Sequence, residues 1–466
     1  MKKNIFIILG FILWSSGSVE AQHYIGNWYG ALELGTTRLK LDFSIALEEG
    51  ILKTTMDSPD QGVHDIVIEE TAFAGDTLTL KSASLNMVFK GYVAPAGNRI
   101  SGIFSQNNYD FKLVLTRTRE ESNTNRRPQD PVEFNYYVEN VRFANRKDTV
   151  ALAGTLTTPF DGDISHTVIL ISGSGPQNRN HELPGVNHRP FLVLSDYLTR
   201  KGIAVLRYDD RGVAQSTGNF ITATTEDFAN DTRAAIEFVR SRPDLEGSKI
   251  GLIGHSEGGM IASMIGNEVD FLVLLGTPGT NIPQLLLSQS RLLSEVQGVE
   301  DSIITASENM LAMVYTYLAT TEDEGEELTN TLKSVFIEGL SYYPEEITNQ
   351  IDADQFAEMQ MESVLSPWFR YFLRFSTYDY LSKVVIPVLG ITGTLDLQVP
   401  YGDNLAAIEY ALQEAGNQHF EVYAYEGVNH LFQTAFSGSN TEYGLLTETF
   451  NPGVMEEIAT WILGLK

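Results

Sequence analysis

The sequence predicts an α/β protein in which a mostly parallel sheet is flanked by helices and is preceded by a smaller antiparallel β-domain. Between Tyr24 and Arg119, apolar and polar residues alternate with period two, which is typical of strands with one buried face. From Phe134 onward, short apolar runs alternate with segments of helical periodicity, which indicates parallel strands buried on both faces. The alternation stops between Gly279 and Lys383, where an amphipathic helical pattern predicts a helical insertion over one end of the sheet.

The first residues have the pattern of an export signal. Lys2 and Lys3 precede the apolar stretch Ile5–Trp14, and Val19–Ala21 resembles a small-residue cleavage site. A membrane-spanning helix needs about twenty apolar residues, and this stretch is too short for one. We therefore expect residues 1–21 to be a signal peptide, and the mature protein to be periplasmic or extracellular without a membrane anchor. A retained anchor is the alternative.

Charge and composition exclude several classes of site and partner. The chain contains no cysteine, which excludes disulfides, a thiolate nucleophile, cysteine metal sites and a lipid-modified N-terminal cysteine. Its formal net charge of −28 repels nucleic-acid phosphates and anionic lipids, so we expect no nucleic-acid partner. Composition sets no oligomeric state.

Residues 22–119 form the predicted β-domain, with about eight short strands separated by Gly, Asn, Asp and Pro turns. It has no cluster of His, Asp or Glu with the spacing of a metal or acid/base site. A polar, charged and proline-containing stretch then predicts a linker over residues 120–133. We expect the aromatic residues of the β-domain to form its core: Trp28, Tyr29, Phe43, Phe89, Tyr92 and Phe104.

Residues 134–466 form the predicted catalytic domain, with the helical cap at about 280–382. The helix-like segments between its strands include Phe191–Arg200, Thr225–Arg240 and Glu257–Asn267, and a final helix is expected at Gly453–Leu463. The strands are expected in "TVILISGSGP", "IAVLRYDD", "KIGLIGHS", "DFLVLLGTPG", "VVIPVLGITGTLD" and "HFEVYAYEG".

The pentapeptide Gly254–Gly258 contains the candidate nucleophile. A G-x-S-x-G motif alone is weak evidence, but here it follows a buried strand and opens a helix. In that context the glycines allow strand and helix to approach closely, and Ser256 is forced into a strained turn above the sheet edge. An ordinary tight turn is the alternative.

A serine hydroxyl needs a base to remove its proton, and the base needs an orienting group. Asp396 follows a late strand and His430 follows the last strand, which gives the chain order Ser, Asp, His. All three would lie at the carboxyl ends of parallel strands. We therefore predict a catalytic triad of Ser256, His430 and Asp396.

An oxyanion hole would complete the site. One donor is predicted to be the backbone N–H of Glu257, which follows the nucleophile. The second should come from the glycine-rich loop "SGSGPQNRN", where the backbone N–H of Ser174 is our first choice. The Glu257 carboxylate is expected to border the pocket without entering the mechanism.

Other residues compete for these roles. His181 and His188 are expected near the mouth of the site and are the best alternatives to His430, although packing or substrate binding suits them better. His255 lies inside the turn, where it can shape the turn but cannot readily reach the neighbouring hydroxyl. Asp403 competes with Asp396, but it falls on the following helix, where a capping role fits better.

Gly254–Gly258, Asp396 and His430 together resemble the α/β-hydrolase fold, over residues 134–466. Within that superfamily, "SGSGPQNRN", "LRYDDRGVAQSTG" and "GHSEGG" are similar to bacterial carboxylesterases of the EstD type, which carry an N-terminal β-domain. The resemblance implies a secreted or periplasmic enzyme that cleaves short acyl esters of small molecules without a cofactor or a metal ion. Ser172 stands where many lipases and esterases have the histidine of an H-G-x-G loop, which leaves the second oxyanion donor open.

The sequence is also compatible with two other functions. A serine exopeptidase uses the same triad, but the N-terminal domain lacks the repeated blade pattern that screens prolyl peptidases. A surface protein whose β-domain captures a glycan is the alternative from a different class.

Overall fold

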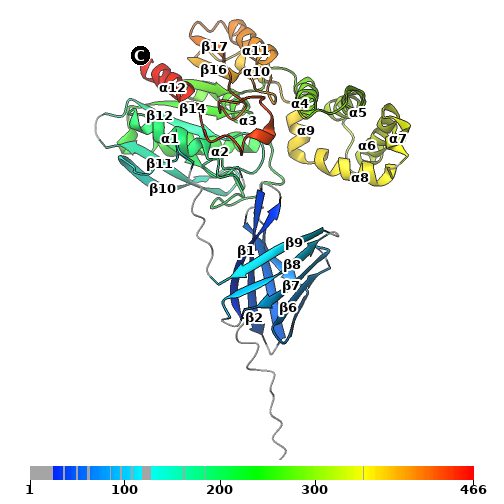
Figure 1. The fold of residues 1–466 in the computed structure, drawn as a ribbon. Helices are drawn as coiled ribbons and strands as arrows, with labels where there is room; N and C mark the ends of the chain where they lie inside the picture. The colour runs from blue at the N-terminus through cyan, green and yellow to red at the C-terminus, as the bar shows by residue number, and fades with distance from the viewer. Residues whose placement is uncertain are drawn as a thin grey trace, which may run out of the picture. The chain divides into compact units, whose positions relative to one another are not determined.

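The computed structural model describes residues 25–34, 37–48, 51–59, 63–83, 85–94, 97–106, 109–117, 127–160, 163–183, 185–349 and 351–465. The predicted signal peptide and residues 120–126 of the predicted linker lie outside these ranges. The chain divides into two compact units, with the main division between Arg126 and Arg127. Figure 1 shows the fold of the two units.

The first unit is an antiparallel β-domain. Its described residues form nine strands in one sheet of order β4-β3-β2-β1-β9-β8-β7-β6-β5. The core contains Trp28, Phe43, Phe89 and Phe104, as predicted. Tyr92 does not join this core: it is 63% exposed, because the alternation of β7 turns Tyr92 outward and buries Val93. The strands are β1 (Gly26–Leu34), β2 (Thr37–Glu48), β3 (Ile51–Ser58), β4 (Val63–Ile68), β5 (Glu70–Ala74), β6 (Thr77–Ser82), β7 (Met87–Val93), β8 (Arg99–Gln106) and β9 (Tyr109–Thr116).

The second unit is built on a mixed sheet. Its described residues place eight strands in the order β10-β11-β13-β12-β14-β15-β16-β17. The pairs β10–β11 and β11–β13 are antiparallel, and every other neighbouring pair is parallel. The strands are β10 (Tyr136–Asn145), β11 (Val150–Pro159), β12 (His166–Ile171), β13 (Ala204–Tyr208), β14 (Lys249–His255), β15 (Phe271–Leu275), β16 (Val388–Gly393) and β17 (Phe420–Tyr425).

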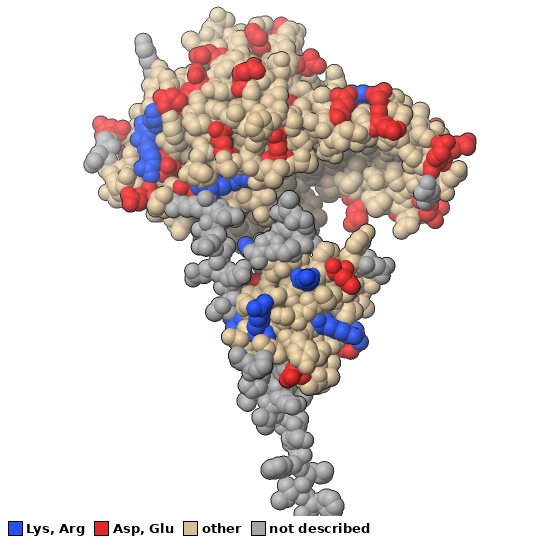
Figure 2. Space-filling view, in the orientation of Figure 1, with Lys and Arg blue, Asp and Glu red and all other residues tan. Residues whose placement is uncertain are grey.

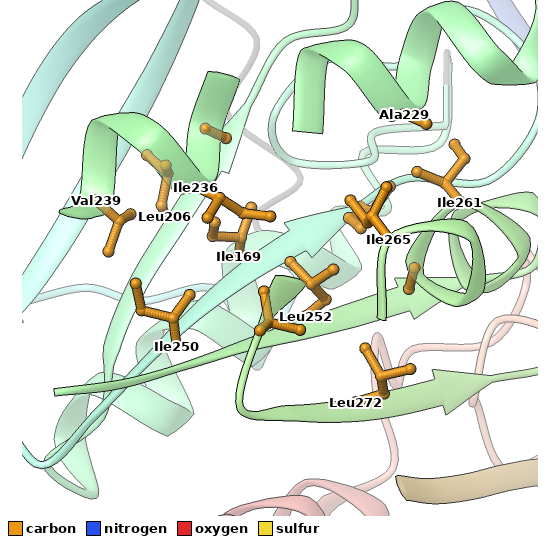
Figure 3. Packing of buried hydrophobic residues seen from close by; sticks show 14 of the residues in the cluster. Ile169, Leu206, Ala229, Ile236, Val239, Ile250, Leu252, Ile261, Ile265 and Leu272 are labelled. Atoms are coloured by element: carbon orange, nitrogen blue, oxygen red, sulfur yellow. The ribbon is translucent and has the colours of Figure 1, made fainter. Parts of the chain in front are cut away.

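Helices cover both faces of this sheet. One core packs α2 (Thr225–Arg240), α3 (Glu257–Met264) and α11 (Tyr401–Glu414) against one face. Figure 3 shows Ile236 and Val239 of α2 beside Leu206, Ile250 and Leu252 of the strands. The second core packs α1 (Pro190–Arg200) and α12 (Pro452–Gly464) against the other face. The strands are therefore buried on both sides, which explains their nearly uninterrupted apolar runs.

A helical cap is inserted between β15 and β16, where the periodicity predicts it. Its apolar core also includes Met260 of α3 and Val399. In the described part of the chain, no helix is both long enough and apolar enough to span a membrane. Figure 2 shows Asp and Glu side chains scattered over the visible face of the second unit, so the negative charge is carried at the surface. The cap helices are α4 (Ile282–Val296), α5 (Asp301–Thr320), α6 (Gly325–Gly339), α7 (Glu345–Thr348), α8 (Ala353–Val364), α9 (Pro367–Leu373) and α10 (Thr377–Leu381).

Candidate active site

Ser256 lies in a sharp turn between β14 and α3. Its φ of +54° and ψ of −120° place a non-glycine residue in a conformation that side chains rarely adopt, which confirms the predicted strain. The two flanking glycines are sterically required. A Cβ on Gly254 would lie 2.2 Å from the Gly258 carbonyl oxygen, and a Cβ on Gly258 would lie 2.2 Å from that of Ile171. The turn therefore needs both glycines and presents Ser256 at the end of the strand.

His430 and Asp396 form a buried pair. Asp396 follows β16, His430 follows β17, and His430 Nδ1 donates a 2.8 Å hydrogen bond to Asp396 Oδ2. The other carboxylate oxygen accepts the backbone N–H groups of Gln398 at 2.9 Å and Val399 at 2.8 Å. A neutral imidazole that donates from Nδ1 carries its lone pair on Nε2, so this geometry selects the tautomer that acts as a base.

Two contacts bring the Ser256 turn to this pair. The Ser256 N–H donates to the Leu275 carbonyl oxygen at 2.8 Å, and the next residue, Gly276, lies against the pair. A Cβ on Gly276 would be 3.2 Å from Asp396 Oδ2 and 3.3 Å from His430 Nδ1. The structure thus gathers the three predicted residues at the carboxyl edge of the sheet.

His255 braces the same region from inside the turn. Its Nε2 donates to the His430 carbonyl oxygen at 2.8 Å, and the two rings are 4.7 Å apart. Burial holds the pKa of His255 well below its usual value, so the ring stays neutral. The expectation that His255 shapes the turn agrees with this contact.

The glycine-rich loop after β12 lies beside the nucleophile. A Cβ on Gly173 would be 3.1 Å from Ser256 Cβ, which places the neighbouring Ser174 close to the turn. Asp210 fixes both sides of the loop, because it accepts the Ser172 hydroxyl at 2.8 Å and the Gln177 N–H at 2.9 Å. Burial raises the pKa of Asp210 to about 8.

The neighbouring charged residues of "LRYDDRG" hold loops together. Asp209 accepts Arg179 Nε at 2.9 Å and Arg179 Nη2 at 2.6 Å. Arg211 binds Asp231 through Nε at 2.7 Å and Asp148 through Nη2 at 2.8 Å.

The rival residues either make other contacts or lie on the surface. His181 and His188 are buried rather than placed at an open mouth, and burial lowers the pKa of each to about 3. His181 packs 4.9 Å from the Phe191 ring, and His188 Nε2 donates to the Thr449 carbonyl oxygen at 2.9 Å. Both rings are therefore held inside the fold, which agrees with the packing role that the sequence favours for them. Asp403 lies exposed in the first turn of α11.

The Glu257 carboxyl group makes contacts that the sequence did not reveal. It is 2% exposed, and its Oε1 accepts the Thr225 hydroxyl at 2.7 Å and the Trp368 indole N–H at 2.8 Å. Burial raises the pKa of Glu257 to about 7. No local pattern relates positions 257 and 368, which the fold alone brings together. Across the described ranges, no group of three or more His, Asp or Glu has the arrangement of a metal site.

Comparisons with known proteins agree with this architecture. Residues 189–297 match a protein family described as serine aminopeptidase, S33. Esterase EstD of Thermotoga maritima is 24% identical over 334 residues, which cover 70% of this chain and 69% of that protein.

Two solved esterase structures are similar at low identity. The Pyrococcus furiosus esterase Pf2001 is 16% identical with a TM-score of 0.42, over 70% of this chain and 91% of its own. Est1E of Butyrivibrio proteoclasticus with bound ferulic acid is 16% identical with a TM-score of 0.40, over 69% and 98%. The sheet order of the second unit, with an antiparallel second strand and a sharp serine turn after the fifth, is that of the predicted fold. The second unit has the α/β-hydrolase fold, and the chain is similar to esterase EstD.

Proposed function

We propose that the protein is a serine hydrolase that cleaves carboxylic esters of small molecules through Ser256, His430 and Asp396. The observation that carries this proposal is the buried 2.8 Å hydrogen bond between His430 and Asp396 beside the strained Ser256 turn. The similarity to esterase EstD supports an ester as the substrate.

The reaction follows from this arrangement. His430 Nε2 accepts the proton of the Ser256 hydroxyl as Oγ attacks the ester carbonyl carbon. The backbone N–H groups of Glu257 and Ser174 stabilise the negative oxygen of the tetrahedral intermediate. His430 then gives its proton to the leaving alcohol. Water, deprotonated by His430, attacks the acyl-serine and releases the acid, which regenerates the serine.

Export and a preference for short acyl chains are part of the same proposal. The basic residues, apolar stretch and small-residue site within residues 1–21 support export to the periplasm or medium. The apolar cap core supports the idea that the cap limits acyl length, because the cap is inserted at the end of the sheet where Ser256 lies.

A serine aminopeptidase is the second candidate, because the matching family carries that description. The two candidates differ in the bond that is cleaved. Turnover of p-nitrophenyl esters should exceed turnover of aminoacyl and aminoacyl-proline anilides, and the reverse preference would favour the peptidase.

Ser256→Ala tests the proposed function directly. The variant should lose p-nitrophenyl acetate and butyrate turnover by about 10⁴-fold or more, since removal of a triad nucleophile leaves only binding and oxyanion stabilisation. Ser263→Ala, which alters a serine on the buried face of α3, is the matched control and should keep its turnover. Unchanged turnover in Ser256→Ala would contradict the proposal.

A further inference from the structure

The residue after the nucleophile is bonded through its side chain to the cap. Glu257 begins α3, and its carboxyl group accepts the indole N–H of Trp368, which lies on α9. The same oxygen accepts the hydroxyl of Thr225, the first residue of α2. Segments more than a hundred residues apart in sequence therefore share one buried acceptor atom.

Packing alone does not require this carboxyl group. A buried carboxyl group costs free energy unless hydrogen bonds replace its lost hydration. The indole ring of Trp368 already stacks on Phe372, with ring centroids 4.9 Å apart. An apolar residue at position 257 would also satisfy the packing. The hydrogen bond between the indole N–H and the carboxyl group additionally fixes how the two side chains are oriented.

Helix α9 is itself fixed to the rest of the cap. Arg370 Nη2 donates to the Asp323 carbonyl oxygen at 3.3 Å. Arg374, the residue that follows α9, donates to the carbonyl oxygens of Ala319 in the last turn of α5 and of Thr321 just after it. The Phe369 ring packs 5.9 Å from Tyr315 of α5. Because α9 is held on that side, its bond to Glu257 connects the whole cap to the nucleophile turn.

We propose that Trp368 and the Glu257 side chain form a positioning tether between the cap and the nucleophile turn. The tether fixes α9 over the substrate end of the sheet and holds the residue whose backbone N–H is the proposed oxyanion donor. It rests on the proposed function. Both side chains are positioning residues, because they act through the turn and the cap rather than on reacting atoms.

Trp368→Phe tests the tether. The phenyl ring keeps the stacking on Phe372 but has no N–H donor. We expect kcat for p-nitrophenyl acetate to fall about tenfold, since a small misplacement in an active site costs this much or more. The kcat/KM ratio for hexanoate over acetate esters should also change, because α9 is released. Trp461→Phe, which alters a tryptophan of α12 that packs on Phe271, is the control and should behave as wild type.

A double-mutant cycle with Glu257→Leu separates a tether from independent structural effects. In a tether, each single change breaks the same bond, so the double variant should lose no more kcat than the worse single variant. Glu257→Gln keeps an acceptor oxygen for the indole N–H and should retain more kcat than Glu257→Leu. Additive losses, or a Trp368→Phe enzyme with wild-type kcat and acyl preference, would overturn the tether.

Hydrogen exchange measures the tether without catalysis. Trp368→Phe should raise amide exchange in residues 367–373 and at the start of α3, while Trp461→Phe should not. If wild-type protein has no turnover that depends on Ser256, the proposed function fails, and the exchange result still decides the tether. Unchanged exchange in both segments would contradict it.

Discussion

At the scale of single residues, what distinguishes His430 is its partner. The buried rings of His181, His188 and His255 contact backbone carbonyls or other rings, and burial lowers the pKa of each. His430 instead donates to a carboxylate that two backbone N–H groups hold in place. An imidazolium that forms during reaction is stabilised only where such a carboxylate faces it.

Asp396→Asn should therefore lower kcat for ester hydrolysis by about 10⁴-fold with little change in KM, because an amide selects the wrong imidazole tautomer. Asp403→Asn is the matched control, since Asp403 lies exposed on α11, and it should keep wild-type kinetics. Steady-state assays with p-nitrophenyl butyrate measure both. The opposite ranking of the two variants would reject Asp396 as the orienting residue.

The buried Glu257 predicts a pH-dependent stability difference. Burial raises the pKa of Glu257 to about 7, so the folded protein keeps a proton that the unfolded chain loses above about pH 4.3. This contribution to stability is complete below the unfolded pKa and is lost as the pH rises through the folded pKa. The glutamine of Glu257→Gln does not titrate. Between pH 5 and 7, the free energy of unfolding of this variant should therefore rise relative to that of wild type, by at most about 1.4 kcal/mol per pH unit.

Urea unfolding at pH 5, 6, 7 and 8 measures this difference. The helical circular-dichroism signal is suitable, because the described part of the first unit contains strands and no α-helix. Glu414→Gln, at the exposed end of α11, is the matched surface control. A pH-independent difference for Glu257→Gln would contradict the buried, proton-binding carboxyl group.

At the scale of elements, the segment between β17 and α12 holds His430 in place. Asn429 accepts the backbone N–H groups of Leu431 and Gln433, both at 3.0 Å. Arg127 donates to the carbonyl oxygens of Leu446 at 2.6 Å and Tyr443 at 3.0 Å further along the same segment. These hydrogen bonds anchor Arg127 to the second unit, although position 127 lies in the range predicted as a linker.

Arg127→Gln should destabilise the second unit by about 2 to 3 kcal/mol, because the buried carbonyl oxygens lose charged donors. Arg146→Gln, in the exposed turn between β10 and β11, is the control. Thermal unfolding followed at the helical signal tests this. Equal melting temperatures for the two variants would show that Arg127 contributes no more than a surface arginine.

Helices and strands whose apolar residues follow a clear pattern were predictable from the sequence, and those without such a pattern were not. The pattern placed α2 at Thr225–Arg240, where the structure has it, because its apolar face repeats with the helical period. The strands β10 and β11 were missed: β10 exposes most of its first residues, and the buried positions of β11 include Gly154 and threonines rather than an uninterrupted apolar run. The positions of the candidate triad residues were predictable because strand ends set them. The contact between Glu257 and Trp368 was not, because it depends on how the cap folds.

At the scale of the whole molecule, the candidate site is built from one unit. Ser256, Asp396, His430 and the loop around Ser174 all belong to the second unit, as do their hydrogen-bond partners described above. The first unit has its own apolar core and its own sheet. Hydrolysis therefore should not need the β-domain.

A fragment of residues 127–466 should keep kcat/KM for p-nitrophenyl butyrate within about threefold of the full chain, since a domain with its own core can fold alone. The fragment begins at Arg127 so that the anchoring contacts remain. Circular dichroism should confirm its helical content before the assay. A folded fragment with a loss of about 100-fold or more would assign the β-domain a part in catalysis.

The central claim is that His430 and Asp396 activate the hydroxyl of Ser256. The most direct measurement is reaction with a fluorophosphonate ester followed by peptide mass mapping. We predict one phosphonyl group per chain, attached at Ser256, with activity lost in proportion, and no labelling in His430→Ala within the same time. Complete inactivation with the label on another residue, or an active enzyme that resists labelling at Ser256, would contradict the account.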